Sequence, residues 1–237
     1  MTPPRTAATP TALVTGASRG LGLALASELN RRGWRLVVDA LDAGRLTAAV
    51  ARYPHPDQVT AMVGDVTDPA HRATLAAAVG DHLDLLVNNA SALGPTPLPH
   101  LADLDPAELQ RVLAVNAVAP LALIQAVLPA LRLASGRILN ISSDAAVEAY
   151  AGWGGYGASK AALDQLAAVL AVEQPELRVY AVDPGDMATD MHRAAAPDDD
   201  DLPAPDTVVP ALMALLEGDV PSGRYRAADL VPAGAAR

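Results

Sequence analysis

The chain has 237 residues, of which 51% are hydrophobic and 19% charged, and its formal net charge is −10. This composition is typical of a globular protein that buries one core, and its acidic balance argues against nucleic acid or an anionic membrane as a partner. The absence of cysteine excludes disulfides and thiol nucleophiles. We find no apolar stretch of membrane-spanning length and no secretory signal, so we expect a cytoplasmic protein without membrane contact.

The N-terminal part of the sequence predicts a strand–helix–strand unit. Residues 1–10 are rich in Pro, Thr and Ala and predict a flexible tail. Residues 12–16, ALVTG, form an apolar run that a glycine ends, as in a short buried strand. Leucines recur every four residues in 21–32, which predicts a helix that ends at Gly33. Residues 34–40 are the next predicted strand.

The alternation of strands and helices continues along the chain. We predict strands at 59–65, 83–90, 136–143 and 177–185, and helices at 68–79, 105–131 and 156–173. Asp68 and Asp105 are expected N-caps, and Pro120 should kink or interrupt its helix. The acidic residues 194–206 predict a mobile surface loop, and 221–237 a short strand with a frayed tail. The pattern indicates one α/β domain, residues 11–237, with a doubly wound, mostly parallel, Rossmann-like sheet and helices on both faces.

A glycine-rich turn, TGASRGLG at residues 15–22, joins the first strand to the first helix. Glycine permits positive φ and a close approach of the backbone to a ligand. The start of the helix presents free N–H groups to a pyrophosphate. In this strand–turn–helix context we favour a dinucleotide site over a purely structural turn.

A tyrosine and a lysine four positions apart, Tyr156 and Lys160, stand in the stretch WGGYGASKAAL, residues 153–163. Residues at this spacing share one helix face. A nearby ammonium group lowers the pKa of a phenol, so we expect Tyr156 to be a general acid or base that Lys160 tunes. The alternative for an isolated pair is a packed tyrosine beside a lysine that reaches the solvent.

The spacing of the glycine turn resembles that of the short-chain dehydrogenase/reductases in their compact single-domain form. The resemblance covers residues 12–230: GDV with Asp65, NNAS at 88–91 with Ser91 in place of a final glycine, and DPGDMATDM at 183–191. Asn116, Ser143, Tyr156 and Lys160 match the four catalytic positions of the family. The resemblance implies an NAD(P)(H)-dependent oxidoreductase that moves a hydride between nicotinamide and a small-molecule carbonyl or secondary alcohol.

The resemblance also implies roles for individual residues. Ser143 would donate a hydrogen bond to the substrate oxygen, Asn116 would hold a water that relays protons, and Lys160 would contact the nicotinamide ribose. For the serine the alternative is a strand-end cap, and for Asn116 a bond to a neighbouring carbonyl. The candidate cofactor-binding residues are Gly16, Ser18, Arg19, Gly20, Leu21, Gly22, Asp39, Asp65, Val66, Asn89, Ala90, Tyr156, Lys160, Pro184, Gly185, Met187 and Thr189. The candidate substrate-pocket residues are Ser143, Tyr150, Trp153, Tyr156 and Met191.

The choice between the two dinucleotides depends on a few residues. Arg19 within the turn favours NADP(H), because a guanidinium pairs well with a 2′-phosphate. Asp39 leaves NAD(H) open as the cofactor, because its carboxylate could bind the ribose 2′-hydroxyl. However, Ala40 and Leu41 fill the positions where the family carries the residues that select NAD or NADP. No histidine spacing suggests a metal site.

Two further expectations concern partners and alternatives. The helices near 107–128 and 156–173 are apolar on more than one face, which predicts a homodimer or homotetramer. The alternative function is a non-enzymatic, redox-responsive NAD(P)-binding regulator with the same fold. A sugar-nucleotide epimerase is disfavoured, because those chains carry a larger C-terminal substrate domain.

Overall fold

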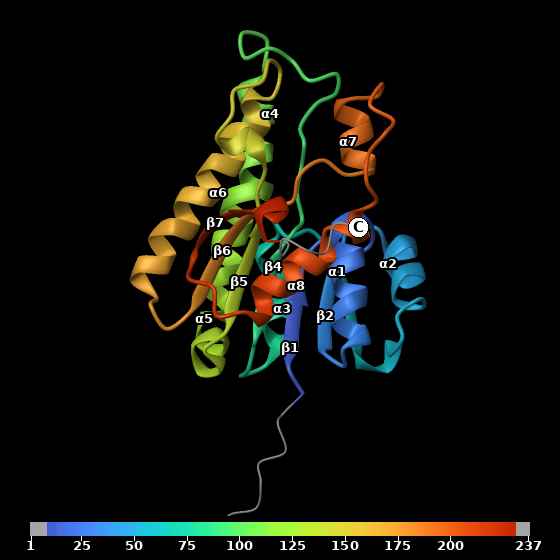
Figure 1. Cartoon of the computed structure of the whole chain (residues 1–237), viewed down its shortest axis with the longest axis vertical. Coiled ribbons are helices and arrows are strands. Elements are labelled where there is room, and N and C mark those ends of the chain that lie inside the picture. The colour runs from blue at the N-terminus through green and yellow to red at the C-terminus, as the bar shows by residue number, and fades with distance from the viewer. Residues whose placement is uncertain (1–8, 231–237) are drawn as a thin grey trace, which may run out of the picture.

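The computed structural model describes residues 9–230, which form one seven-stranded parallel sheet in the order β3-β2-β1-β4-β5-β6-β7 (Figure 1). The strands are β1 Thr11–Val14, β2 Arg35–Ala40, β3 Val59–Val63, β4 Leu85–Asn88, β5 Arg137–Ile141, β6 Arg178–Asp183 and β7 Gly223–Arg226. The order reverses between β1 and β4, and ligands of doubly wound sheets bind at such a switch point. The predicted fold class is confirmed; the tail at 1–8 and the end at 231–237 lie outside the described residues.

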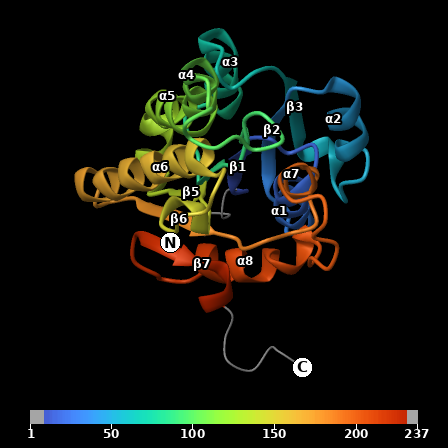
Figure 2. The same ribbon diagram turned by 90° about the horizontal axis from the view of Figure 1, so that it is seen from above.

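Helices cover both faces of the sheet, as Figure 2 shows from above. They are α1 Gly20–Arg31, α2 Ala43–Val50, α3 Pro69–Val79, α4 Pro106–Leu113, α5 Ala119–Ala134, α6 Gly154–Glu173, α7 Asp190–Ala195 and α8 Val209–Glu217. Alternation along β1 divides the core: Ala12 and Val14 pack with α1, α2 and α8, whereas Leu13 packs with α3, α5 and α6. Because side chains alternate between the faces of a strand, every central strand is buried on both sides.

The predicted long helix is interrupted before its proline. A π-helical segment, Ala114–Val118, separates α4 from α5, and Pro120 lies in the first turn of α5. The backbone stays helical from α4 through this segment into α5, and the π-helical turn just before Pro120 accompanies the missing N–H of the proline. The run Pro106–Ala134 nevertheless has the length of a membrane span and contains an 18-residue window with a mean hydropathy of 2.0, contrary to our expectation from the sequence. Its buried face packs in the core, where α5 contacts α3 and β4.

The acidic stretch 194–206 is framed by short helical turns. α7 ends at Ala195 and a 3₁₀ turn begins at Pro205, so regular structure is absent only from residues 196–204. Ala188 N–H donates a hydrogen bond to the carbonyl of Pro203, which joins the chain before α7 to the end of the irregular segment. In Figure 1, α7 lies above the upper ends of α1 and α2, at the carboxyl edge of the sheet.

Candidate active site

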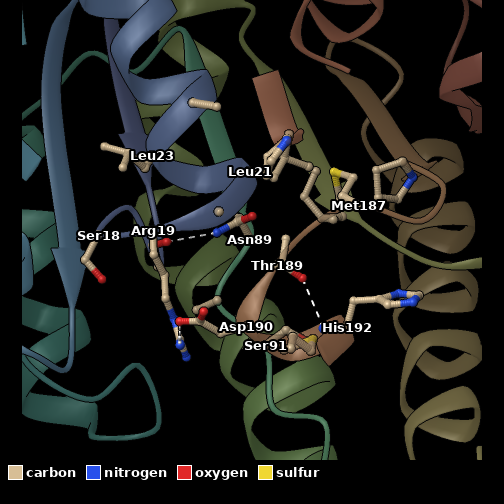
Figure 3. Close-up of a pocket in the computed structure, with 18 of the residues that line it drawn as sticks. Ser18, Arg19, Leu21, Leu23, Asn89, Ser91, Met187, Thr189, Asp190 and His192 are labelled. Atoms are coloured by element: carbon tan, nitrogen blue, oxygen red, sulfur yellow. Dashed lines mark hydrogen bonds and ion pairs between the residues drawn. The ribbon is translucent and has the colours of Figure 1, made fainter. Parts of the chain in front are cut away.

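A cavity of about 1240 Å³ lies at the carboxyl ends of the strands, and α1, the loop after β4, the start of α6 and α7 contribute to its walls. This volume exceeds that of a usual drug-sized pocket, so it has room for a dinucleotide and a small substrate. Every predicted catalytic, cofactor and substrate residue lines it except Gly22 and Asn116. Figure 3 shows part of this lining, with the glycine turn facing the segment that leads into α7.

The glycine turn is held in place by its neighbours. Gly16 and Gly20 have φ values of 66° and 57°, which favour glycine. Thr15 accepts hydrogen bonds from the N–H groups of Asn89 and Ala90, and the Asn89 amide donates to the carbonyls of Thr15 and Gly16. These bonds join the turn to the loop after β4, across the switch point of the sheet.

Gly22 has a packing role. A Cβ atom on this residue would lie 2.3 Å from Asn89 Nδ2 and 2.5 Å from the carbonyl oxygen of Gly16. The residue is not part of the cavity lining, so its contact with the cofactor stays a prediction. Its small size lets α1 pack closely on the turn.

The start of α1 fits a phosphate group. Its N-cap, Arg19, makes no side-chain cap bond, and its first turn contains no acidic residue. In contrast, α2, α3 and α4 are capped by Asp42, Asp68 and Asp105. The first N–H groups of α1 therefore have no side-chain acceptor and point their partial positive charge at the cavity.

Asp39 lines the cavity and bonds to the glycine turn. Its Oδ1 accepts a hydrogen bond of 2.8 Å from Gly16 N–H, and its Oδ2 lies 3.1 Å from His71 Nε2. The side chain is 1% exposed, and burial raises the pKa of its carboxyl. Since both oxygens are engaged inside the protein, Asp39 positions the glycine turn.

Tyr156 and Lys160 both lie on the cavity wall but are more deeply buried than expected. Lys160 is 2% exposed, donates a 2.8 Å bond to the carbonyl of Ile141, and has its Nζ 5.5 Å from the centre of the Tyr156 ring. Burial lowers the pKa of Lys160 to about 8. It also raises the pKa of Tyr156 to about 12, against which a hydrogen bond with Ser91 acts. The expected lowering of the tyrosine pKa is thus wrong for the protein by itself, because desolvation of the phenol outweighs the distant ammonium.

Ser143 follows β5 and caps a short 3₁₀ turn, Asp144–Ala146. Its hydroxyl donates to Asp144 Oδ1 at 3.0 Å and accepts from Ala145 N–H at 3.1 Å. The Asp144 carboxylate also accepts a hydrogen bond from Tyr150. Ser143 therefore has the capping role that was the alternative in the sequence analysis. A substrate oxygen in this part of the cavity would compete with Asp144 for the hydrogen bond from the Ser143 hydroxyl.

Asn116 lies in the π-helical segment and is 1% exposed. Its Oδ1 accepts from the N–H of Ala92 and the hydroxyl of Ser91, while its Nδ2 donates to the carbonyl of Ala92 and to Ser159. The side chain thus makes the neighbour bonds that were the alternative to a water-holding role. It ties the loop after β4 to α6, close to Tyr156, because Ser159 also bonds the Tyr156 carbonyl.

The remaining predicted residues surround the same cavity. Trp153 stacks edge-on against Tyr156, with ring centres 5.7 Å apart, and Tyr150 is half-exposed at the mouth. Asp65 is exposed and caps the turn into α3 by accepting from Thr67 N–H. The other cofactor and substrate candidates on the wall are Ser18, Leu21, Val66, Asn89, Ala90, Pro184, Gly185, Met187, Thr189 and Met191. Among residues 9–230 no three potential metal ligands come together, and a metal-free site stays a prediction.

Sequence reasoning missed two residues of the rim, Arg45 on α2 and Asp190 on α7. Arg45 lies in a segment for which no element was predicted, although Asp42 three residues before it is a good N-cap signal. Asp190 follows Thr189, which caps α7 by accepting from His192 N–H. The signal for that helix was present in the Thr-Asp pair.

A doubly wound parallel sheet, a glycine turn at its switch point and a buried Tyr–Lys pair in the same cavity define an oxidoreductase of the dinucleotide-binding class. Residues 10–200 match the short chain dehydrogenase family, and the chain belongs to that family. The family and its oxidoreductase members support an enzyme over a non-enzymatic binding protein.

Two similar curated proteins are reductases. Sepiapterin reductase of Mus musculus is 36% identical over 199 residues, which cover 77% of this chain and 76% of the reductase. The rhamnolipids biosynthesis 3-oxoacyl-acyl-carrier-protein reductase of Pseudomonas aeruginosa is 33% identical over 214 residues, covering 84% and 81%.

Solved structures with the same fold were determined with NADP-type ligands. An alcohol dehydrogenase from the archaeon Thermococcus sibiricus, complexed with 5-hydroxy-NADP, aligns with a TM-score of 0.83 at 26% identity, covering 92% of this chain and 95% of the other. A structure from Escherichia coli CFT073 complexed with NADPH aligns with a TM-score of 0.85 at 29% identity, covering 92% and 96%.

Proposed function

We propose that the protein is an NADP(H)-dependent reductase of a small ketone or aldehyde, with Tyr156 as the proton donor. The observation that carries this proposal is the Tyr156 phenol, which lies on the wall of the same cavity as the glycine turn and has its pKa raised to about 12 by burial. A phenol with this pKa is protonated at neutral pH. It is therefore ready to donate to a carbonyl oxygen that gains negative charge.

The other residues have supporting roles in this proposal. Bound nicotinamide supplies the hydride. Tyr156 gives its proton to the substrate oxygen, and Ser143 turns its hydroxyl from Asp144 to that oxygen, which stabilises the developing charge. Lys160, with its pKa lowered to about 8, shares a proton readily near neutral pH and supports reprotonation of the phenol. Asn116 holds the loop and helix that frame the reacting atoms.

The substitution Tyr156→Phe tests the catalytic assignment, since it removes only the hydroxyl. We expect turnover on a verified carbonyl substrate to fall by roughly 10²-fold or more, because general acid catalysis is lost, while cofactor binding is kept. Steady-state kinetics and a cofactor titration measure the two properties separately. Full activity in the variant would refute the role of Tyr156.

The preference for NADP(H) rests on Arg19 at the cavity rim and on the carboxylate of Asp39, which already bonds to Gly16 and His71. NADP-type ligands in the two similar structures support it. A fluorescence titration with NADPH and with NADH checks it. For Arg19→Ala we expect weaker binding of NADPH and little change for NADH. An equal loss for both would contradict a role in reading the 2′-phosphate.

We further propose that two copies associate through α6. Val169 and Val172 are 44% and 81% exposed, and with Gln165, Ala168 and Glu173 they line a shallow groove on one face of the helix. Apolar side chains at this helical spacing favour burial against a partner. A cytoplasmic location stays a prediction from composition.

A further inference from the structure

The rim of the cavity holds a cluster of charges that the glycine turn itself does not need. Asp190 Oδ2 lies 2.6 Å from Arg19 Nη1 and 3.4 Å from Arg45 Nη1, and Asp190 Oδ1 lies 2.5 Å from Arg193 Nη2. Figure 3 shows the side chain of Arg19 extending from the start of α1 to the carboxylate of Asp190. Hydrogen bonds from Arg19 and Arg193 hold the pKa of Asp190 below its ordinary value, so this carboxylate is charged at neutral pH.

These charges come from three different elements. Arg19 precedes α1, Arg45 lies in the first turn of α2, and Asp190 is the first residue of α7. Helix α7 has no buried residue of its own, and the ion pairs join it to the start of α1 and to α2. The pairs are about half-exposed, and such pairs exchange readily for a better anion.

Positive charge exceeds negative charge at this point of an otherwise acidic chain. Three guanidinium groups, from Arg19, Arg45 and Arg193, face the carboxylates of Asp190 and of Asp42, which lies 3.7 Å from Arg45. A phosphate monoester carries about −1.5 to −2 charges and offers three acceptor oxygens, so it suits a pair of arginines better than one carboxylate does.

Arg45 supplies a cation that the neighbouring sequence lacks. The end of β2 is followed by Leu41, which is 73% exposed and offers no charge to a ligand. Arg45 reaches the same carboxylate oxygen as Arg19, so the two guanidinium groups converge on one anion position. Both residues line the cavity that holds the glycine turn.

We propose that Asp190 is an internal substitute for the 2′-phosphate of NADP(H): it occupies the anion position between Arg19 and Arg45, and the phosphate displaces it. Arg45 is then the second residue that selects NADPH over NADH, and Asp190 weakens NADPH binding by competition. This inference rests on the proposed function, since it requires a dinucleotide at the glycine turn.

The experiment is a pair of fluorescence titrations, with NADPH and with NADH, on the wild type and on Asp190→Asn and Arg45→Ala. We expect Asp190→Asn to tighten NADPH binding by roughly two- to five-fold, as the release of exposed ion pairs allows, and to leave NADH unchanged. We expect Arg45→Ala to weaken NADPH binding by about three- to ten-fold with little effect on NADH.

The matched control is Asp186→Asn, which removes an equal charge from the same segment. Asp186 is 67% exposed, and its recorded ion pair is with His192, at 3.5 Å. If this control tightens NADPH binding as much as Asp190→Asn does, the effect is general electrostatics and the proposal is wrong. A second control is the triple variant with Arg19→Ala and Arg45→Ala, in which Asp190→Asn should no longer change the ratio of the two affinities.

Other outcomes separate this inference from the proposed function. Weaker NADPH binding in Asp190→Asn, or equal effects of Arg45→Ala on both dinucleotides, would overturn the competition while the reductase assignment stands. Failure of the wild type to bind either dinucleotide would overturn both. Thermal unfolding of each variant shows whether a lost affinity reflects a lost fold.

Discussion

Lys160 is a charged residue placed where charge is unfavourable. It is 2% exposed and its recorded hydrogen bond is to the carbonyl of Ile141. It is also the only lysine in the chain. Burial of this ammonium group thus lowers the stability of the fold and shifts the pKa of a residue in the cavity, as is common at active sites.

The first prediction is that Lys160 titrates at about pH 8, because burial lowers its pKa from the ordinary value of 10.5. Since the chain has one lysine, protein grown with 13Cε-labelled lysine gives a single lysine signal. An NMR titration of that signal measures the pKa directly. A midpoint near 10 would show that Lys160 is better solvated than the structure indicates.

The second prediction concerns stability. Between pH 8 and 10.5 the unfolded chain binds a proton at Lys160 that the folded chain does not, so stability rises with pH in this window. Below pH 8 the folded protein bears the full penalty. We therefore expect Lys160→Met to raise the free energy of unfolding at pH 7 by about 2 kcal/mol, as an order of magnitude, while turnover is lost.

Urea unfolding of the wild type and of Lys160→Met at several pH values tests this sign. The advantage of the variant should shrink as the pH rises from 8 to 10.5. A variant that is less stable than the wild type at pH 7 would mean that the bond to Ile141 outweighs the cost of burial.

At the scale of elements, the π-helical segment between α4 and α5 carries the residue that joins three parts of the site. Asn116 bonds the loop at Ala92, the hydroxyl of Ser91 and Ser159 on α6. The widened turn thus sets a polar side chain among apolar helices, where all of its bonding groups find partners.

The third prediction is that Asn116→Ala lowers the free energy of unfolding by about 1–3 kcal/mol, because the part-buried N–H of Ala92 loses its partner. It should also lower turnover, since the loop beside Tyr156 is released. The control is Gln125→Ala, at an exposed position on α5, which should change neither property. Equal stability of Asn116→Ala and the wild type would contradict the bonding described above.

The sequence predicted those elements whose signals are local and strong. The apolar runs of β1, β4, β5 and β6 and the Asp-Pro starts of α3 and α4 were all identified correctly, because caps and periodicity determine such elements. Helices α2, α7 and α8 were missed. The first two are short, with eight and six residues, and offer little periodicity to read.

The sequence predicted most of the residues that line the site, but it did not predict how their pKa values shift. The four-residue spacing predicted that Tyr156 and Lys160 lie together. It contains no information on desolvation, which raises the pKa of the tyrosine and lowers that of the lysine. The contact of Asp39 with His71 was not predicted for a similar reason, because the two residues are 32 positions apart in sequence. Contacts of that range follow from the fold and leave no local pattern.

At the scale of the whole molecule, four of the ten exposed large hydrophobic residues among residues 9–230 lie on the helices α5 and α6. Leu133 on α5 is 70% exposed, and on α6 Leu166, Val169 and Val172 are 36%, 44% and 81% exposed. A chain with a net charge of −10 repels its own copies at long range, so a dimer needs such an apolar contact to be stable.

The fourth prediction is therefore that the wild type is a dimer or tetramer and that Val169→Asp with Val172→Asp shifts it toward the monomer. Light scattering after gel filtration measures the mass of both. The control is Val147→Asp, an exposed valine (62%) that lies outside α6. A monomeric wild type would contradict the proposed association.

The burial of Lys160 also determines how the folded protein reacts with reagents that acylate amines. Every other basic side chain that bears a fixed positive charge is an arginine, which such reagents leave untouched. Mild acylation should therefore leave Lys160 of the folded protein unmodified, because this amine is 2% exposed. Acylation of Lys160 would then show that the fold had opened around this residue.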